Sequence, residues 1–498
     1  MAGKFLSLFK PVARGIPEIK APERKVRFNE KLFWTALVLV VFLVMSEVPL
    51  FGLTPGAGQD LAPLRVIFAS TRGTLMELGI GPIVTGGLIL QLLIGSNMIE
   101  ADMGNPEDRG LFTTANKVFA IILTGVQATA YIIGGMYGSL SGTASILIFL
   151  QLLASGIIVL LMDELVQKGW GFGSGISLFI MAGVAQKVAL DCFYASPSVD
   201  NYGSSGVFVA LAQSLSSGKN LLGLFQRLPT YVPSGSPTGT TPILNLYGTQ
   251  YPSIIGFFAT VAAFLVVIYF EGVRVELPLS YAGYKGYRSK YPIKMLYVSN
   301  LPVIFASALF ANVYFFSQLL WNSYNSNPAN HNFWLNLLGT YIQNPASTTT
   351  SYVPSGGLVY YVTAPRNMIQ VGTDPVQALG YLGILVVFCV IFSLTWLEVG
   401  GLGPATVAQQ LVDSGMQIPG YRRSGKAVES ILKRYIPAVT VIGGIIVGLI
   451  AGLTDFFGVY GSGMGILLSV GIIYQYYETL MQERAAEMYP AFRRIFGE

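Results

Sequence analysis

The stretch VFAIILTGVQATAYIIGGMYGSLSGTASILIFLQLLASGIIVLLM, residues 118–162, contains no charged side chain. A helix needs about 20 mostly apolar residues to cross the hydrocarbon core of a membrane, so this stretch is long enough for two crossings. Its middle, residues 137–142, reads Tyr-Gly-Ser-Leu-Ser-Gly, which is typical of a turn. The stretch therefore predicts two membrane-spanning helices joined by a tight turn.

The rest of the chain extends this pattern. Of its 498 residues, 52% are hydrophobic and only 11% are charged, which is far from the composition of a soluble protein. Nearly charge-free segments of similar length predict ten spans, at residues 32–50, 79–98, 118–137, 144–162, 174–192, 252–270, 298–320, 376–396, 436–454 and 459–477. The predicted fold is an all-α polytopic membrane protein.

The distribution of lysine and arginine predicts the orientation. With these spans, 24 of the 30 basic residues lie on one side, and that side is cytoplasmic by the positive-inside rule. We therefore expect both ends of the chain in the cytoplasm. The predicted parts are an amphipathic N-terminal segment (1–31), an N-terminal half (32–194), an external loop (195–251), a C-terminal half (252–481) and a cytoplasmic tail (482–498). The C-terminal half contains cytoplasmic loops at 271–297 and 398–435 and an external loop at 322–375.

The inventory of reactive side chains argues against an enzyme. The only histidine, His331, lies in a polar external stretch, and neither an HExxH motif nor a Ser/His/Asp set can be assembled around it. Cys192 and Cys389 lie in or near apolar spans and cannot define a disulfide framework or a metal site. We expect no catalytic residues, no metal and no cofactor.

A secondary transporter of a small neutral solute is the alternative, because ten spans divided five and five suit the inverted repeats of many carriers. Ion-coupled carriers generally hold ionisable groups near the bilayer midplane. Here the middle turns of the spans contain none, and Glu47, Lys187 and Asp191 lie near external ends. The coupling chemistry of such a carrier is therefore missing.

Two glycine-rich regions carry aliphatic residues one helical turn apart. Ile80 and Val84 open the second span, and Ile176 and Ile180 open the fifth. Such pairs occur in almost every membrane helix, so the residues alone favour ordinary packing. The segment before the second span, about 61–76, is too short and too polar to cross, and we expect a helix that re-enters the membrane or an external amphipathic loop helix.

Longer motifs are more specific, and with them the chain resembles the SecY family, the channel-forming (alpha) subunit of the Sec protein translocon, in its archaeal and eukaryotic branch. The matching text recurs in order along nearly the whole chain, apart from the long external loops. It comprises residues 16–19 with 22–25, 72–84, 161–165, 173–180, 291–294 with 299–304, and 461–465.

The resemblance implies two pseudo-symmetric inverted halves of five helices around an hourglass pore. An aliphatic ring at the waist would resist ions by dewetting yet part around a polypeptide; its members would be Ile80, Val84, Ile176, Ile180, Ile304 and Ile450. A plug helix would contain Leu64, Arg65, Val66, Ile67, Phe68 and Arg72. A lateral gate would carry Thr85, Gln127 and Asn312.

The resemblance also implies a function and partners. The chain would translocate signal-sequence-bearing polypeptides and release transmembrane segments sideways into the lipid bilayer. Small SecE-like and SecG-like (gamma and beta) subunits would complete a heterotrimer. The ribosome would dock on basic loops through Arg274, Lys285, Arg288, Lys290, Arg422, Arg423 and Lys426. The external loops lack an Asn-x-Ser/Thr sequon, which favours an archaeal plasma membrane, with the endoplasmic reticulum as the alternative.

Overall fold

The structure is a computed structural model of the whole chain. It describes residues 5, 11, 17–24, 26–53, 69–71, 73–95, 98–99, 106–134, 137, 140–195, 204–218, 221–225, 227, 230–231, 243–244, 252–281, 288–296, 301–325, 332–343, 352–365, 368–400, 402–413, 416–417 and 425–488. We call these the described residues.

Ten long helices correspond one for one to the ten predicted spans. They are α2 (Phe28–Glu47), α4 (Gly81–Gly95), α5 (Pro106–Ile133), α6 (Gly142–Leu165), α7 (Gly175–Phe193), α10 (Ile254–Gly272), α11 (Leu301–Leu320), α15 (Pro375–Val399), α17 (Gly425–Phe456) and α18 (Gly463–Met488). Within the described residues, eight of them are long and apolar enough to cross a membrane, whereas α4 is shorter and α18, although it has 26 residues, is less apolar. The all-α architecture is confirmed.

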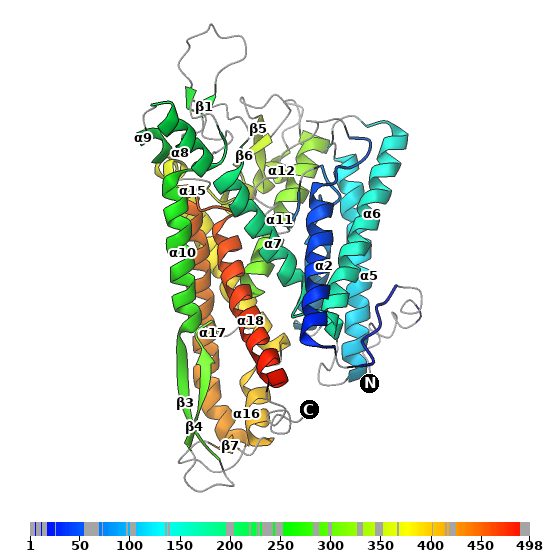
Figure 1. Ribbon diagram of the computed structural model, residues 1–498, viewed down its shortest axis with the longest axis vertical. Coiled ribbons are helices and arrows are strands. Elements are labelled where there is room, and N and C mark those ends of the chain that lie inside the picture. Colours follow the sequence, from blue (N-terminus) through cyan, green and yellow to red (C-terminus); the bar gives the residue numbers. More distant parts are fainter. Residues whose placement is uncertain are drawn as a thin grey trace.

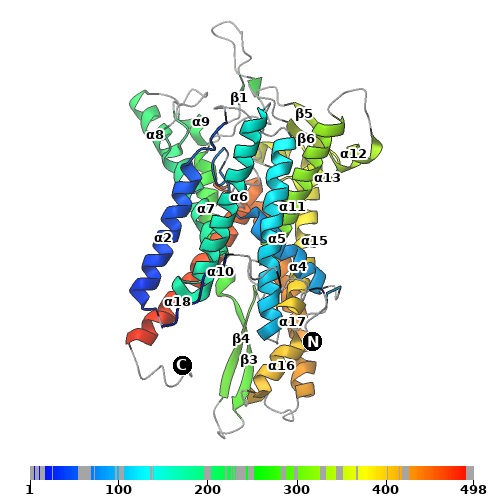
Figure 2. The ribbon, with the colours of Figure 1, turned by 90° about the vertical axis from the view of Figure 1, so that its right-hand side faces the viewer.

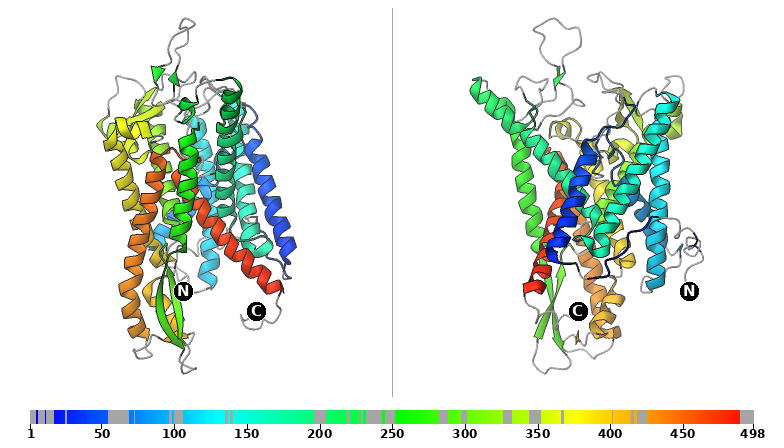
Figure 3. Two further views of the ribbon diagram at one scale, coloured as in Figure 1. Left: turned by 60° about the vertical axis from the view of Figure 1, so that its left-hand side comes forward. Right: turned by 45° about the vertical axis from the view of Figure 1, so that its right-hand side comes forward.

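The long helices run side by side, and α7 and α18 cross the bundle obliquely (Figures 1 and 3). Close packing joins α4 to α5, α5 to α6 and α15 to α17, and α7 packs on α18 across the two halves. The π-helical turns η2 (Val166–Trp170) and η3 (Trp321–Asn325) extend α6 and α11.

One end of the bundle carries a small sheet that the sequence analysis treated as loops. The strands β3 (Arg274–Tyr281), β4 (Arg288–Lys294) and β7 (Met416–Gln417) form an antiparallel sheet in the order β4-β3-β7, and α16 (Pro404–Asp413) lies beside it (Figure 2). The connections 271–297 and 398–435 therefore contain a sheet and a helix that the sequence analysis did not predict. The sequence carries one signal of a strand here: apolar residues occupy every second position, at Val275, Leu277 and Leu279.

The opposite end carries short elements. They are α8 (Val207–Ser216), α9 (Leu222–Phe225), α12 (Phe333–Leu338), α13 (Leu358–Val362), α14 (Met368–Thr373) and the two-stranded pairs β1 (Thr230–Tyr231) with β2 (Ile243–Leu244) and β5 (Thr340–Gln343) with β6 (Tyr352–Gly356). They belong to the regions predicted as external loops.

The first and last helices meet at the end that carries the sheet. Lys31 of α2 forms an ion pair with Glu483 of α18. The described part of the N-terminal segment lies nearby, because the Trp170 indole donates to the Lys20 carbonyl over 2.9 Å. Lys168 donates to Glu18 and holds the pKa of that carboxyl below its usual value. The start of α2 and the C-terminal part of α18 therefore lie at the same end of the bundle.

The two helices of the opening stretch pack through a glycine. A Cβ on Gly156 of α6 would lie 2.6 Å from Cγ2 of Thr124 on α5. The Thr124 hydroxyl donates to the Ala120 carbonyl over 2.7 Å, which fixes its rotamer. The close approach of α5 and α6 therefore requires glycine at this position.

We expect Gly156→Val to lower the free energy of unfolding by about 1–3 kcal/mol, because the added methyl groups overpack the α5–α6 contact. Thermal unfolding of the protein in nanodiscs measures the change. Gly125→Val is the matched control, since no atom lies within 4 Å of a Cβ there. Equal losses in both variants would contradict the packing argument.

Candidate functional site

The six predicted ring residues come from four helices and the turn before one of them. Ile80 directly precedes α4, Val84 lies in its first turn, and Ile176 and Ile180 lie in the first turns of α7. Ile304 belongs to α11 and Ile450 to α17. All six contribute to one apolar cluster, in which Ile80, Val84 and Ile180 are buried and the other three are partly buried.

The cluster distinguishes Ile450 from its neighbour. Leu449 is 37% exposed on the outer surface of the bundle, whereas Ile450 packs against the central cluster. Of the two adjacent aliphatic residues, Ile450 therefore occupies the inward position that a ring requires.

The turns before α4 and α7 hold their backbone by polar contacts. The Glu77 carboxylate accepts a hydrogen bond from the Gly73 amide. The Asp163 carboxylate, at the end of α6, accepts one from the Ile176 amide over 2.9 Å. The Asp163 carboxylate satisfies an amide at the start of α7 that has no partner within the helix, and the Glu77 carboxylate fixes the turns that precede α4.

The predicted plug residues Leu64, Arg65, Val66, Ile67, Phe68 and Arg72 lie outside the described residues. Ala69, between Phe68 and Arg72, is buried and contacts α7: a Cβ on Gly183 would lie 3.1 Å from the Ala69 Cβ. Gly183 follows Ile180 by three residues, so the predicted plug segment passes within a helical turn of the ring at Ala69.

The predicted helix at 61–76 does not continue through its last residues. Residues 73–76 form turns, and Thr74 makes an antiparallel bridge with Pro49 just beyond α2. Gly73 has φ of 69°, a left-handed conformation that a helix does not allow. The bridge is closed by a Leu50 amide that donates to the Gly73 carbonyl over 2.8 Å. Backbone pairing with the end of α2 thus replaces the last helical turn.

The predicted gate residues lie where α4, α5 and α11 meet. The Asn312 side-chain amide of α11 donates to the Thr85 hydroxyl of α4 over 3.2 Å and to the Ala308 carbonyl over 2.7 Å. The structure therefore brings two of the three together across the halves. Gln127 of α5 is half-buried and, within the described residues, makes no hydrogen bond to either of them.

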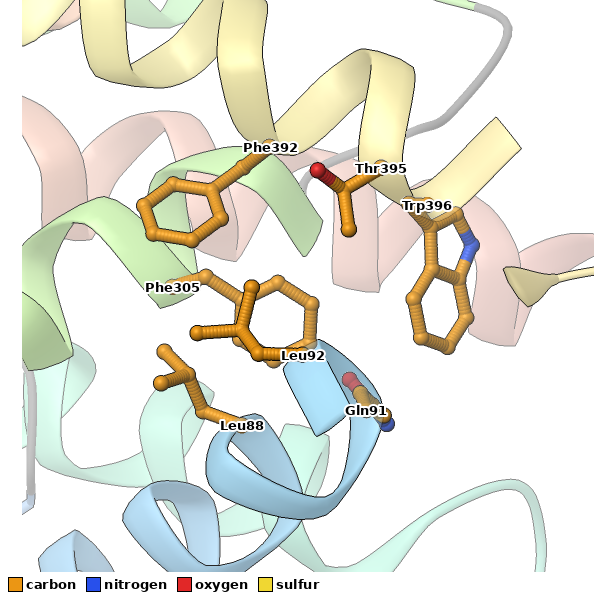
Figure 4. A pocket seen from close by; sticks show the side chains of 7 residues that line it. All are labelled: Leu88, Gln91, Leu92, Phe305, Phe392, Thr395 and Trp396. Atoms are coloured by element: carbon orange, nitrogen blue, oxygen red, sulfur yellow. The ribbon is translucent and has the colours of Figure 1, made fainter. Parts of the chain in front are cut away.

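A small apolar pocket opens at the same seam, between α4, α11 and α15 (Figure 4). Within the described residues, the side-chain oxygen (Oε1) of Gln91 is buried there without a hydrogen-bond partner. The sequence analysis missed the pocket because three helices distant in sequence build it. Its lining consists of Leu88, Gln91, Leu92, Phe305, Phe392, Thr395 and Trp396.

The structure describes only some of the basic residues that were predicted to bind the ribosome. Arg274, at the base of β3, donates to the Tyr474 hydroxyl of α18 over 3.0 Å, and Lys426 is exposed at the start of α17. Arg288 and Lys290 lie on β4, where the structure describes the backbone. Lys285, Arg422 and Arg423 lie outside the described residues.

Comparison with known proteins identifies the family. The SecY family model matches residues 74–477, and the model described as the plug domain of Sec61p matches residues 40–73. The chain belongs to the SecY family. Its helices α4 and α11 are therefore the second and seventh helices of a SecY fold, and the seam between them holds Thr85 and Asn312, two of the three residues that the resemblance implies for the lateral gate.

Solved structures agree with this assignment. A protein-conducting channel is 35% identical, with a TM-score of 0.78, over 97% of this chain and 98% of its own. A SecY protein whose plug domain stabilises the closed state and maintains a membrane seal has a TM-score of 0.76 at 35% identity, over 97% of this chain and 98% of its own. Sec61 in the canine ribosome-channel complex from the endoplasmic reticulum has a TM-score of 0.75 at 34% identity, with the same coverage.

The contact at the seam predicts energetic coupling between two residues that are 227 positions apart. We expect Asn312→Ala and Thr85→Val to couple by about 0.6 kcal/mol, the average for interhelical hydrogen bonds in membranes. A double-mutant cycle on thermal unfolding in nanodiscs measures this energy. The control cycle pairs Asn312→Ala with Gln127→Leu and should show no coupling; equal coupling in the two cycles would count against a direct bond.

Proposed function

We propose that this SecY-family chain is a protein-conducting channel of the general secretory pathway, which translocates polypeptides that bear a signal sequence. The observation that carries the proposal is that Ile80, Val84, Ile176, Ile180, Ile304 and Ile450, drawn from both halves of the bundle, all belong to its main apolar core. A narrow aliphatic constriction excludes water and ions, and its branched side chains can part around any polypeptide. Such a seal performs no bond chemistry.

Transmembrane segments leave the channel sideways through the seam between α4 and α11. One 3.2 Å hydrogen bond from Asn312 to Thr85 is weak enough to break reversibly. The adjoining pocket, with Phe305, Phe392 and Trp396, offers apolar surface to an entering signal sequence. The plug residues 64–68 and 72 close the external half of the resting pore.

The ribosome docks at the end of the bundle that carries β3, β4 and α16. That end holds Arg288, Lys290 and the exposed Lys426. Lys285, Arg422 and Arg423 lie close to them in the sequence, outside the described residues. Basic side chains bind the phosphates of ribosomal RNA without reading its sequence. SecE-like and SecG-like subunits complete the assembly, as the family implies.

This end and both termini face the cytoplasm of an archaeon, and the protein is a multi-pass protein of its plasma membrane. The ion pair between Lys31 and Glu483 supports the shared side of the termini. The endoplasmic reticulum is the alternative location, since a similar solved structure, Sec61, comes from that membrane.

The transporter alternative lacks support from the described spans. Two carboxylates buried at helix ends bind backbone or tyrosine: Asp163, near the end of α6, accepts from the Ile176 amide, and Asp455, near the end of α17, accepts from the Tyr381 hydroxyl over 3.0 Å. Both groups have structural partners, so neither is free to bind a coupling ion.

A cysteine at the ring should contact a polypeptide in transit. We expect Ile180→Cys, with Cys192 and Cys389 replaced by alanine, to crosslink to a ribosome-stalled secretory chain only when the signal sequence is functional. Leu449→Cys, on the outward side of α17, is the matched control and should give no adduct. If the stalled chain binds but forms no adduct with Ile180→Cys, the transporter becomes the preferred function.

Charge reversal should weaken ribosome docking. We expect Arg422→Glu, Arg423→Glu and Lys426→Glu together to lower ribosome affinity at least about tenfold. The slope of log affinity against log salt concentration should become less steep by roughly 0.7–0.9 per lost phosphate contact. Sedimentation of ribosomes with proteoliposomes over a range of salt concentrations measures both. Lys187→Met, at the far end of α7, should leave both unchanged; an equal loss there would refute docking at this end.

A further inference from the structure

The last helix of each half begins after the same four-residue turn. Phe172-Gly173-Ser174-Gly175 leads into α7, and Tyr460-Gly461-Ser462-Gly463 leads into α18. Gly173 and Gly461 have φ of 68° and 83°, so both turns use the left-handed conformation at the same position. We call them the first turn (172–175) and the second turn (460–463).

Each turn is fastened in the same way to the first helix of its own half. The Phe172 amide donates to the Thr35 hydroxyl of α2 over 3.0 Å. The Tyr460 amide donates to the Thr260 hydroxyl of α10 over 2.9 Å. The two turns are thus equivalent parts of the inverted repeat in both sequence and hydrogen bonding.

Each turn is also capped by an aspartate from the preceding helix. Asp163 accepts from the Ile176 amide over 2.9 Å, and Asp455 accepts from the Gly463 amide over 2.6 Å. A Cβ on Gly175 would lie 2.6 Å from the Asp163 Cα, and one on Gly463 would overlap the Ala451 carbonyl. Glycine is therefore required at the start of both helices.

The second half then holds the first turn. The Tyr476 hydroxyl of α18 lies against the first turn, 2.9 Å from the Phe172 carbonyl and 3.0 Å from that of Ser174. The last helix of the second half thus holds the turn from which the last helix of the first half starts.

This contact differs from the seam in its chemistry. Equivalent helices of the two halves meet at two places, α4 with α11 and α7 with α18. The first contact carries the 3.2 Å bond between Asn312 and Thr85. The second carries the two contacts of the Tyr476 hydroxyl with the rigid, capped first turn, so it resists separation while the seam can part.

We infer that Tyr476 is a positioning residue that forms a clasp across the halves: it holds the start of α7 against α18. Because Ile176 directly follows the first turn, the clasp fixes where α7 presents Ile176 and Ile180 to the ring. Loosening the clasp should free the first turn and disturb the resting seal.

Amide hydrogen exchange of the full-length protein in nanodiscs tests the clasp. Tyr476→Phe keeps the ring but removes the hydroxyl, so exchange in residues 171–176 should become about fivefold faster, as the loss of one hydrogen bond predicts.

A matched control separates the clasp from general destabilisation. Tyr477→Phe alters an exposed tyrosine on the same helix. It should leave exchange at the first turn unchanged. Unchanged exchange in Tyr476→Phe, or equal changes in Tyr477→Phe, overturns the inference.

The effect on the seal rests on the proposed channel function and has a separate readout. In planar bilayers, Tyr476→Phe should raise the resting potassium conductance severalfold, while Tyr477→Phe should not. Faster exchange with unchanged conductance would keep the clasp and remove Ile176 and Ile180 from the seal, which contradicts the proposed ring. Faster exchange together with raised conductance supports both.

Discussion

The hydrocarbon core of a membrane offers no water to an unpaired backbone amide, so every helix start within it needs a partner from the protein. This chain starts α4 and α7 next to its aliphatic ring. Asp163 provides an acceptor for the Ile176 amide at the start of α7, and Glu77 provides one for the Gly73 amide in the turns before α4. Ile176 lies at the first of these contacts and Ile80 follows Glu77 by three residues, so the shape of the apolar constriction depends on carboxylates that take no part in the seal.

Small residues give each half its rigidity. Gly156 lets α6 approach Thr124 of α5, and in the other half a Cβ on Gly448 of α17 would lie 2.9 Å from Val386 of α15. Close backbone approach gains dispersion contacts that lipid does not replace. The seam between α4 and α11 relies on one side-chain amide and a shallow pocket instead, and the two halves can separate there without disturbing either interior.

The hydropathy of the sequence was sufficient to predict the ten helices, and it failed where helices leave the membrane. α17 begins at Gly425 rather than near 436, because its first turns are polar and extend beyond the apolar span. The pairing of Asn312 with Thr85 came from family resemblance, since no spacing rule brings residues of two halves together. The repeated Gly-Ser-Gly before α7 and α18 was visible in the sequence, but only the matching bonds to Thr35 and Thr260 make it a repeat.

The base of the β3–β4 hairpin is tied to α18 from both strands. Arg274 and Lys294 are paired residues on β3 and β4, and they lie 3.7 and 3.3 Å from the Glu478 carboxylate of α18. The seven residue pairs of the hairpin extend roughly 20 Å from this point. In mechanical terms, the hairpin is a lever with its fulcrum at Glu478, and a load on its far end applies a torque to the helix that carries Tyr476.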